Sequence, residues 1–278
     1  MMDDVRKTSV AGSWYPATAG ALAADVEGYL LAADRAGPEP SGDLVALIVP
    51  HAGLIYSGPV AAYAYRLLRD RRFDVAVLVG PSHFVGFDGV ALYPSGGFET
   101  PFGVARIDVA CASDIAGASE VVRVLPDPHA REHSLEMQLP FLMHLAPTTP
   151  IVPLLIGYQT AATAAALGGA LSAALRGRRA LMVASSDLSH YQDAATAAAL
   201  DRVVIDCVSR FDPDGLQTAL DVTPGHACGG GPMVAVMRAA RVSGARDAAI
   251  LNYADSGDVS GDKSAVVGYL AAALGNFA

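Results

Sequence analysis

Short runs of aliphatic and β-branched residues alternate with longer segments of helical periodicity along the chain. The short runs are apolar on both faces, which is typical of strands in a sheet covered by helices on each side. We predict strands at Leu44–Val49, Val75–Val79, Ile151–Ile156, Leu181–Ala184, Ile250–Tyr253 and Ala265–Tyr269. We predict helices at Ala17–Ala33, Pro59–Leu68, Ser134–Leu145, Thr160–Leu175, Ala194–Ser209 and Gly231–Ala240. The alternation predicts an α/β fold, a single layered domain over residues 1–278 with a mostly parallel central sheet covered by helices.

Composition and charge narrow the class of partner. Hydrophobic residues make up 52% of the chain and charged residues 17%, which is typical of a folded globular protein. The formal net charge is −9, and the basic clusters are the short ones at Arg69–Arg72 and Arg176–Arg179, both predicted to be helix ends. A nucleic-acid surface needs concentrated positive charge, so we expect no nucleic-acid partner.

The cysteines and the chain's most apolar segments favour a cytoplasmic location. Three widely spaced cysteines make a poor disulfide framework and suit a reducing compartment. The N-terminus, Met1–Asp4, lacks the basic and apolar blocks of a signal peptide. The most apolar long stretch, Thr160–Leu175, is mainly Ala and Gly, whereas a membrane span takes ~20 strongly apolar residues. We therefore expect a cytoplasmic protein with no membrane partner.

Histidines follow three of the predicted strands within a few residues. His51 follows the first strand, His83 the second and His190 the fourth. Ligands of open α/β sheets bind beyond the carboxyl ends of the strands, and neutral imidazole binds Fe, Zn, Cu and Ni. The pattern predicts a shared functional site if adjacent strand ends bring His51 and His83 together. The alternative is that each is a buried histidine that bonds a backbone carbonyl.

Cys228 lies in a glycine-rich stretch directly ahead of the helical segment Gly231–Ala240. Glycines allow a sharp bend and close approach to a bound group, and a helix N-terminus stabilises a thiolate. Cys228 is therefore a candidate metal ligand or reactive thiol, and the alternative is an inert cysteine in a turn. Cys111 and Cys207 lie in ordinary helical contexts, and we expect both to be inert.

Two further polar segments are candidate parts of the site. In Ser185–His190, His190 could act as an acid or base, with Asp187 orienting it and Ser186 lining the pocket. The alternative for this segment is a capped helix start. In the second segment Glu132 and His133 could line the pocket, whereas Glu136 is predicted to be an ordinary acid in the first turn of a helix. We expect the remaining histidines to be surface or core residues: His129, His144 and His226.

Taken together, these motifs resemble those of the Memo family, described in bacteria and archaea as AmmeMemoRadiSam system protein B. The resemblance runs colinearly from about Val5 to Leu274. The segments that carry it are VRKTSVAGSWYPA, VPHAGLIYSGPVAAYAY, VGPSHF, PFG, REHSLEMQLPFL, SSDLSHY, HACGGGP and YADSGDVSGDKSAVVGY.

The resemblance implies a fold similar to that of class III extradiol dioxygenases. It implies a single metal ion held by His51, His83 and Cys228, with His190 in the acid/base position and Asp187 beside it. Cysteine stands where the dioxygenases carry a carboxylate, and a soft thiolate favours Cu(I) or Zn. The metal ion that we expect at this site is iron or copper, with zinc possible. A radical-SAM protein and an AMMECR1-like protein are the partners that the resemblance implies.

Two functions of different classes fit these features. The first is a metal-dependent oxidoreductase that acts on a small organic substrate with iron or copper and O2. The alternative is a non-catalytic ligand- or peptide-binding module that uses the dioxygenase-like pocket. A metal hydrolase with an activated water is a third class. No G-x-S-x-G or G-x-G-x-x-G motif supports an α/β-hydrolase or a dinucleotide-binding protein.

Overall fold

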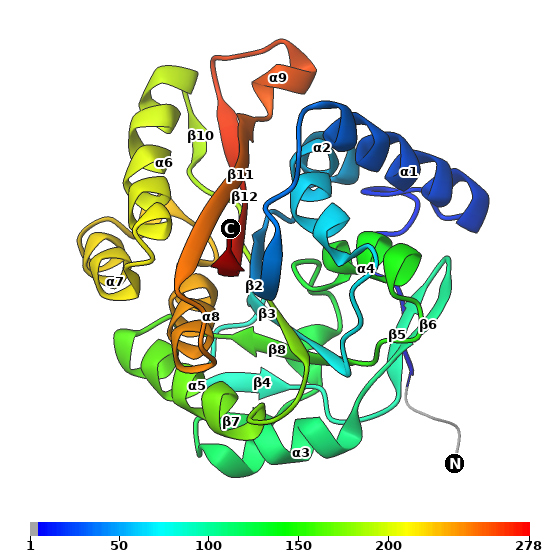
Figure 1. Ribbon diagram of the computed structural model, residues 1–278, viewed down its shortest axis with the longest axis vertical. Coiled ribbons are helices and arrows are strands. Elements are labelled where there is room, and N and C mark those ends of the chain that lie inside the picture. Colours follow the sequence, from blue (N-terminus) through cyan, green and yellow to red (C-terminus); the bar gives the residue numbers. More distant parts are fainter. Residues whose placement is uncertain (1–4) are drawn as a thin grey trace.

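The computed structural model describes residues 5–278. The signal-peptide expectation depends partly on Met1–Asp4, which lie outside the described residues. Within them a nine-stranded sheet has the order β10-β12-β2-β9-β3-β8-β4-β7, with β11 paired to β12 (Figure 1). Its strands are β2 (Gly42–Val49), β3 (Val75–Pro81), β4 (Val90–Leu92), β7 (Val122–Val124), β8 (Ile151–Ile156), β9 (Ala180–Ser185), β10 (His190–Gln192), β11 (Asp247–Asp255) and β12 (Val266–Phe277). A second sheet joins β1 (Val5–Arg6), β5 (Gly97–Thr100) and β6 (Gly103–Arg106).

Most of the parallel pairing in the large sheet lies at its centre, and one further parallel pair, β4 with β7, lies at an edge. Strands β2, β9, β3 and β8 are parallel neighbours, as predicted. Towards the edges the pairing changes, because β12 is antiparallel to β2 and β4 is antiparallel to β8. Strand β12 follows β11 through a short connection, and two strands joined in this way pair antiparallel. The prediction of parallel pairing therefore holds for the centre of a mixed sheet.

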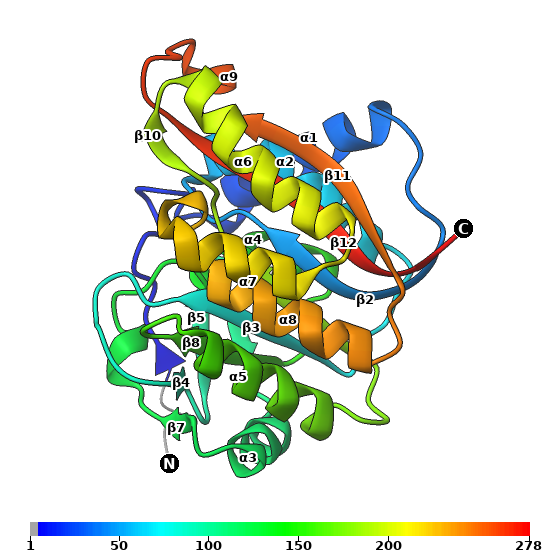
Figure 2. The ribbon, with the colours of Figure 1, turned by 90° about the vertical axis from the view of Figure 1, so that its left-hand side faces the viewer.

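Helices cover both faces of this sheet, which confirms the α/β fold class. One face carries α5 (Ala161–Ala174), α6 (Ala194–Ser209), α7 (Pro213–Val222) and α8 (Gly230–Val242) (Figure 2). The opposite side carries α1 (Ala19–Arg35), α2 (Leu54–Tyr65) and α4 (Leu139–Leu145) (Figure 1). The remaining helical segments are α3 (Val109–Ala118), α9 (Gly257–Ser260) and the 3-10 turns η1 (Arg66–Leu68), η2 (Asp127–His129), η3 (Glu136–Gln138) and η4 (Pro224–His226).

Helix boundaries differ from the predicted ones where packing outweighs local signals. Helix α2 begins at Leu54 and runs through Pro59, which we predicted as its start. The predicted helix over 134–145 is a 3-10 turn followed by α4. Helices α3 and α7 were not predicted, although Asp108 and Asp212 cap them. The segment Ser185–His190 begins no helix, so the alternative of a capped helix start is wrong.

The alanine- and glycine-rich stretch predicted as a packed helix is α5. A Cβ atom added at Gly168 would lie 3.1 Å from the Ala235 carbonyl oxygen of α8, so small side chains are what allow these two helices to approach closely. In the part of the chain that the structure describes, no helix combines the length and apolar character needed to cross a bilayer.

His129 is a core residue, as the sequence suggested. Its Nε2 lies 3.1 Å from the Ala91 carbonyl oxygen, and its ring contacts those of Tyr93 and Phe98. Burial lowers the pKa of His129 to about 4. Because the unfolded chain keeps the ordinary value near 6.5, the unfolded state binds the proton first, and the stability that neutral His129 contributes is lost as the pH falls from 6.5 towards 4.

This gives a prediction for the variant His129→Gln, whose amide can still bond Ala91. Between about pH 7.5 and about pH 4.5 the free energy of unfolding of the wild type should fall by about 2 to 3 kcal/mol more than that of the variant. Urea unfolding of chelator-treated protein at both pH values measures the difference. Equal pH dependence of the two proteins would contradict the buried, neutral state of His129.

Candidate metal centre

The central parallel strands place two of the predicted histidines at one edge of the sheet. His51 follows β2 and His83 follows β3, and their ring centroids lie 5.2 Å apart. We had expected these two strands to be adjacent. They are not, because β9 lies between them and pairs with both. The last residue of β9, Ser185, contacts His51, so the intervening strand contributes to the site.

Cys228 completes this group from the loop before α8. Its Sγ lies 3.2 Å from His51 Nε2. The loop is fixed at both sides of the sulfur, because the Cys228 amide donates to the Asp187 carbonyl (3.2 Å) and the Gln159 side chain donates to the Cys228 carbonyl (2.7 Å). One potential ligand atom of each of His51, His83 and Cys228 lies within 4.8 Å of the other two.

Hydrogen bonds determine which nitrogen of His51 carries the proton. The Ser185 hydroxyl donates to the Ser134 carbonyl (2.7 Å) and accepts from the Gln138 amide (2.7 Å). Its one proton is thus committed, so it can only accept from His51 Nδ1, which lies 2.9 Å away. His51 Nδ1 therefore carries the hydrogen, and the lone pair of Nε2 faces the Cys228 sulfur.

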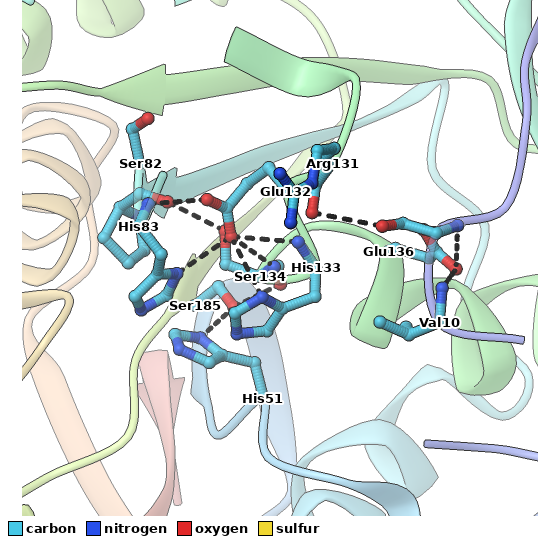
Figure 3. A network of polar contacts seen from close by, with 12 residues as sticks. Val10, His51, Ser82, His83, Arg131, Glu132, His133, Ser134, Glu136 and Ser185 are labelled. Carbon is cyan, nitrogen blue, oxygen red and sulfur yellow. Dashed lines mark hydrogen bonds and ion pairs between the residues drawn. The ribbon is translucent and has the colours of Figure 1, made fainter. Parts of the chain in front are cut away.

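Glu132 fixes His83 in the same way (Figure 3). The carboxylate accepts from His83 Nδ1 at 2.9 Å and from the His83 amide at 2.6 Å. It also accepts from the amides of His133 (3.0 Å) and Ser134 (2.9 Å). Burial opposes ionisation, but the hydrogen bonds from His83 and Ser134 lower the pKa of Glu132 to about 2. An ionised carboxylate has no proton to donate, so His83 Nδ1 is the donor, and in the neutral ring the lone pair lies on Nε2.

His133 forms a wall beside these histidines. Its ring stacks on that of His83 with centroids 4.5 Å apart and lies 4.5 Å from the ring of Trp14. Burial lowers the pKa of His133 to about 4, so the ring is neutral near pH 7. His83, Glu132 and His133 also form a group with metal-ligand spacing. Since four N–H groups already occupy the Glu132 carboxylate, this second group fits a metal less well than the first.

The segment between β9 and β10 places Ser186 and Asp187 behind the centre. The buried Asp187 carboxylate accepts from the amides of His51 (2.6 Å) and Ala52 (3.3 Å), and burial raises its pKa to about 7. It thereby holds the His51 backbone, whereas we had expected it to orient His190. The buried Ser186 hydroxyl accepts from the Gly229 amide (2.9 Å) and so joins this segment to the cysteine loop, whereas we had expected it to line the pocket.

His190 is half-buried at the start of β10. Its Nδ1 donates to the Leu188 carbonyl at 2.8 Å, which leaves Nε2 unprotonated and able to accept a proton. Burial lowers its pKa, and this effect outweighs the hydrogen bond to Leu188, which raises it. Neutral His190 is therefore the form present near pH 7, as a general base requires.

The pKa of the Cys228 thiol is shifted in the direction opposite to the one we expected. We expected the N-terminus of α8 to stabilise a thiolate, but burial and the neighbouring Asp187 carboxylate raise the pKa of Cys228. In the metal-free protein the sulfur is therefore protonated, and a metal would have to displace that proton. Two imidazole nitrogens and a thiol whose proton can be displaced fit a cation that accepts nitrogen and sulfur ligands.

Glu136 is not the ordinary first-turn acid that the sequence predicted. It is fully buried and forms an ion pair with Arg6 at 2.6 Å. It also accepts from the Tyr15 hydroxyl (2.8 Å) and from the amides of Ser9 and Val10. These partners lie more than 120 residues away in sequence, so nothing local in the chain indicates them. The contact fastens the N-terminal segment to the Glu132–His133 loop (Figure 3).

A cavity of about 470 Å³ adjoins Cys228 on the side of α7 and α8. Its walls include Tyr158, Gln159, Leu220 and Gly231. Sequence reasoning did not single out Gln159, nor Ser185 and Gln138, which position His51. Their role depends on strand order and on contacts across the sheet, so the sequence carried no local signal for them.

Comparison with known proteins identifies relatives over almost the whole chain. A family model described as "Memo-like protein" matches residues 6–273. A MEMO1 family protein of Methanothermobacter thermautotrophicus is 36% identical over 272 residues, covering 95% of this chain and 98% of its own. One of Ignicoccus hospitalis is 38% identical, with 96% and 97% covered. The crystal structure of an uncharacterized Escherichia coli K12 protein, 18% identical, has a similar fold, with a TM-score of 0.54 over 82% of this chain and 99% of that one.

Proposed function

The chain belongs to the Memo family, and from this premise we propose that it is a metal-dependent oxidoreductase-like protein that acts on a small organic substrate. His51, His83 and Cys228 hold a single metal ion, iron or copper. The observation that carries this proposal is the fixed orientation of the two imidazoles. Each has its Nδ1 bonded to a neighbouring side chain, so that both Nε2 lone pairs remain for a cation beside the sulfur.

Three protein ligands leave further coordination positions for substrate and oxidant. When bound, the metal would supply redox chemistry with dioxygen. The chain's own residues orient the ligands: Glu132 and Ser185 keep both imidazoles in the ligating tautomer. The Asp187 carboxylate keeps the turn after β2 in place by bonding two successive amides. His190 holds or accepts the substrate's proton at Nε2, because its Nδ1 is committed to Leu188.

The test separates metal binding from turnover. Protein purified without oxygen is reconstituted with Fe(II) or Cu(I), and oxygen consumption is followed with a panel of small phenols and organic acids. His190→Ala should retain the metal content of the wild type and lose at least about 100-fold in turnover, the usual scale of general acid–base catalysis. His226→Ala, in the turn before the cysteine loop, serves as the histidine control. Turnover that survives in His190→Ala would remove the proposed acid/base role.

A second candidate function is that of a ligand- or peptide-binding module. Exposed aromatic side chains favour it: Trp14 and Phe84, which are 37% and 52% exposed, both contact His133 beside the centre. Such a surface could bind a ligand without any turnover. Ligand binding that persists in Cys228→Ala, together with absent oxygen consumption, would favour this function. Association with radical-SAM and AMMECR1-like proteins remains a separate proposal.

A further inference from the structure

The two short arginine clusters of the sequence meet at the opposite end of the sheet from the metal centre. Residues 69–72 precede β3 and residues 176–179 precede β9, and these two strands are parallel neighbours. The segments are joined directly, since the Asp74 amide donates to the Arg179 carbonyl (2.8 Å) and the Arg179 amide donates to the Asp74 carboxylate (3.0 Å). Arginines more than 100 residues apart in sequence therefore belong to one surface.

Between these segments lies a cavity of about 590 Å³, which we call the arginine pocket. It also includes the first residues of β2 and the C-terminal ends of α5 and α8. Five arginines line it: Arg71, Arg72, Arg176, Arg178 and Arg179. They are five of the chain's 19 lysines and arginines, in a protein of net charge −9. Asp43 also lines the pocket, and Asp114 and Asp74 pair with two of these arginines, so the charge that remains is positive and favours an anionic ligand.

Three of these arginines are held in place by the protein. Arg71 donates to the carbonyls of Leu67 and Gly42. Arg178 pairs with Asp114 at 2.5 Å and Arg179 with Asp74 at 2.7 Å. The guanidinium groups of Arg72 and Arg176 have no ion pair or hydrogen bond with any residue between 5 and 278. These two are therefore free to bind an anion, whereas Arg178 and Arg179 are already paired with carboxylates.

The rest of the lining combines polar residues, namely Asp43, Ser172 and Ser243, with an apolar wall. The apolar wall includes Leu44, Val45, Phe73, Leu175, Met182 and Val242. Small-molecule sites in proteins typically enclose ~300–1,000 Å³, and the arginine pocket falls within that range. An inorganic anion would leave most of this volume and the apolar wall unused. A ligand that fills the pocket therefore needs both an anionic group and an apolar or flat body.

We propose that the arginine pocket binds a phosphorylated small molecule of mononucleotide size. Its phosphate is bound by Arg72 and Arg176, because a planar guanidinium forms paired hydrogen bonds to phosphate oxygens. Its body lies against the apolar wall that contains Phe73 and Val242. This site shares no residue with the candidate metal centre, so it is independent of the proposed oxidoreductase function.

The test is isothermal titration calorimetry with AMP and with inorganic phosphate. The double variant Arg72→Gln/Arg176→Gln is compared with wild type and with Arg202→Gln, an exposed arginine of α6 that lies outside the pocket. We expect AMP to bind wild type and Arg202→Gln equally, and to bind the double variant at least tenfold more weakly. Inorganic phosphate should bind wild type at least tenfold more weakly than AMP does. Since both substituted side chains are exposed and unpaired, the variant should keep the far-UV circular dichroism and metal content of wild type.

Two results would overturn the proposal. If AMP does not bind wild type, or binds the double variant as tightly, the arginines serve another purpose. Arg176 follows the C-terminus of α5, where a positive charge is favourable without any ligand. In that case the double variant would show a lower melting temperature and unchanged titrations. Equal affinity for AMP and inorganic phosphate would contradict the role of the apolar wall.

Discussion

Replacing His51 with alanine is expected to abolish stoichiometric metal binding. The variant removes one of the three donor atoms that lie within 4.8 Å of one another, and it leaves Cys228 without the neighbouring imidazole. Loss of a group that merely orients a ligand typically costs 10–100-fold in metal affinity, so loss of the ligand itself should cost more than ~100-fold. Elemental analysis and electron paramagnetic resonance of protein purified without oxygen measure the effect.

The controls for this prediction come from the same chain. His83→Ala and Cys228→Ala should reproduce the loss, because each removes one donor of the same group. His144→Ala should retain the wild-type metal content, since His144 bonds Glu27 and belongs to neither group with metal-ligand spacing. Wild-type protein that holds no more metal than His51→Ala would remove the premise of the proposed oxidoreductase.

The second large effect is a loss of stability in the variant Arg6→Ala. Arg6→Ala leaves the fully buried Glu136 carboxylate without its cation, and it removes the hydrogen bonds that Arg6 donates to the carbonyls of His129 and Glu132. Breaking a buried ion pair by removing one partner typically costs ~3–5 kcal/mol. The free energy of unfolding in urea should therefore fall by several kcal/mol.

The neighbouring residue provides a matched control for this loss. Lys7 forms an ion pair with Glu99 at 3.0 Å, but its side chain is 77% exposed, and exposed pairs contribute ~0–1 kcal/mol. Lys7→Ala should therefore unfold almost as the wild type does. If Arg6→Ala and Lys7→Ala lose the same small amount, the N-terminal segment is not fastened by the buried pair, and our account of Glu136 is wrong.

The sequence by itself determined the fold class and the position of the histidines at strand ends. Runs such as Ile151–Ile156 are apolar at every position, which only a sheet covered on both faces accommodates. Because parallel strands deliver the residues that follow them to one edge of the sheet, the sequence alone assigns His51 and His83 to the same edge. Helix and strand periods are local properties, and the sequence displays them directly.

The tertiary structure alone decided which side chains face one another. The order β2-β9-β3 inserts Ser185 between two histidine-bearing strands, and no spacing in the chain encodes strand order. The same holds for Glu136, whose partner Arg6 lies 130 residues away, and for the two arginine clusters that share one pocket. Hydrogen bonds and charges act over a few ångströms of space, so their partners become known only when the chain has folded.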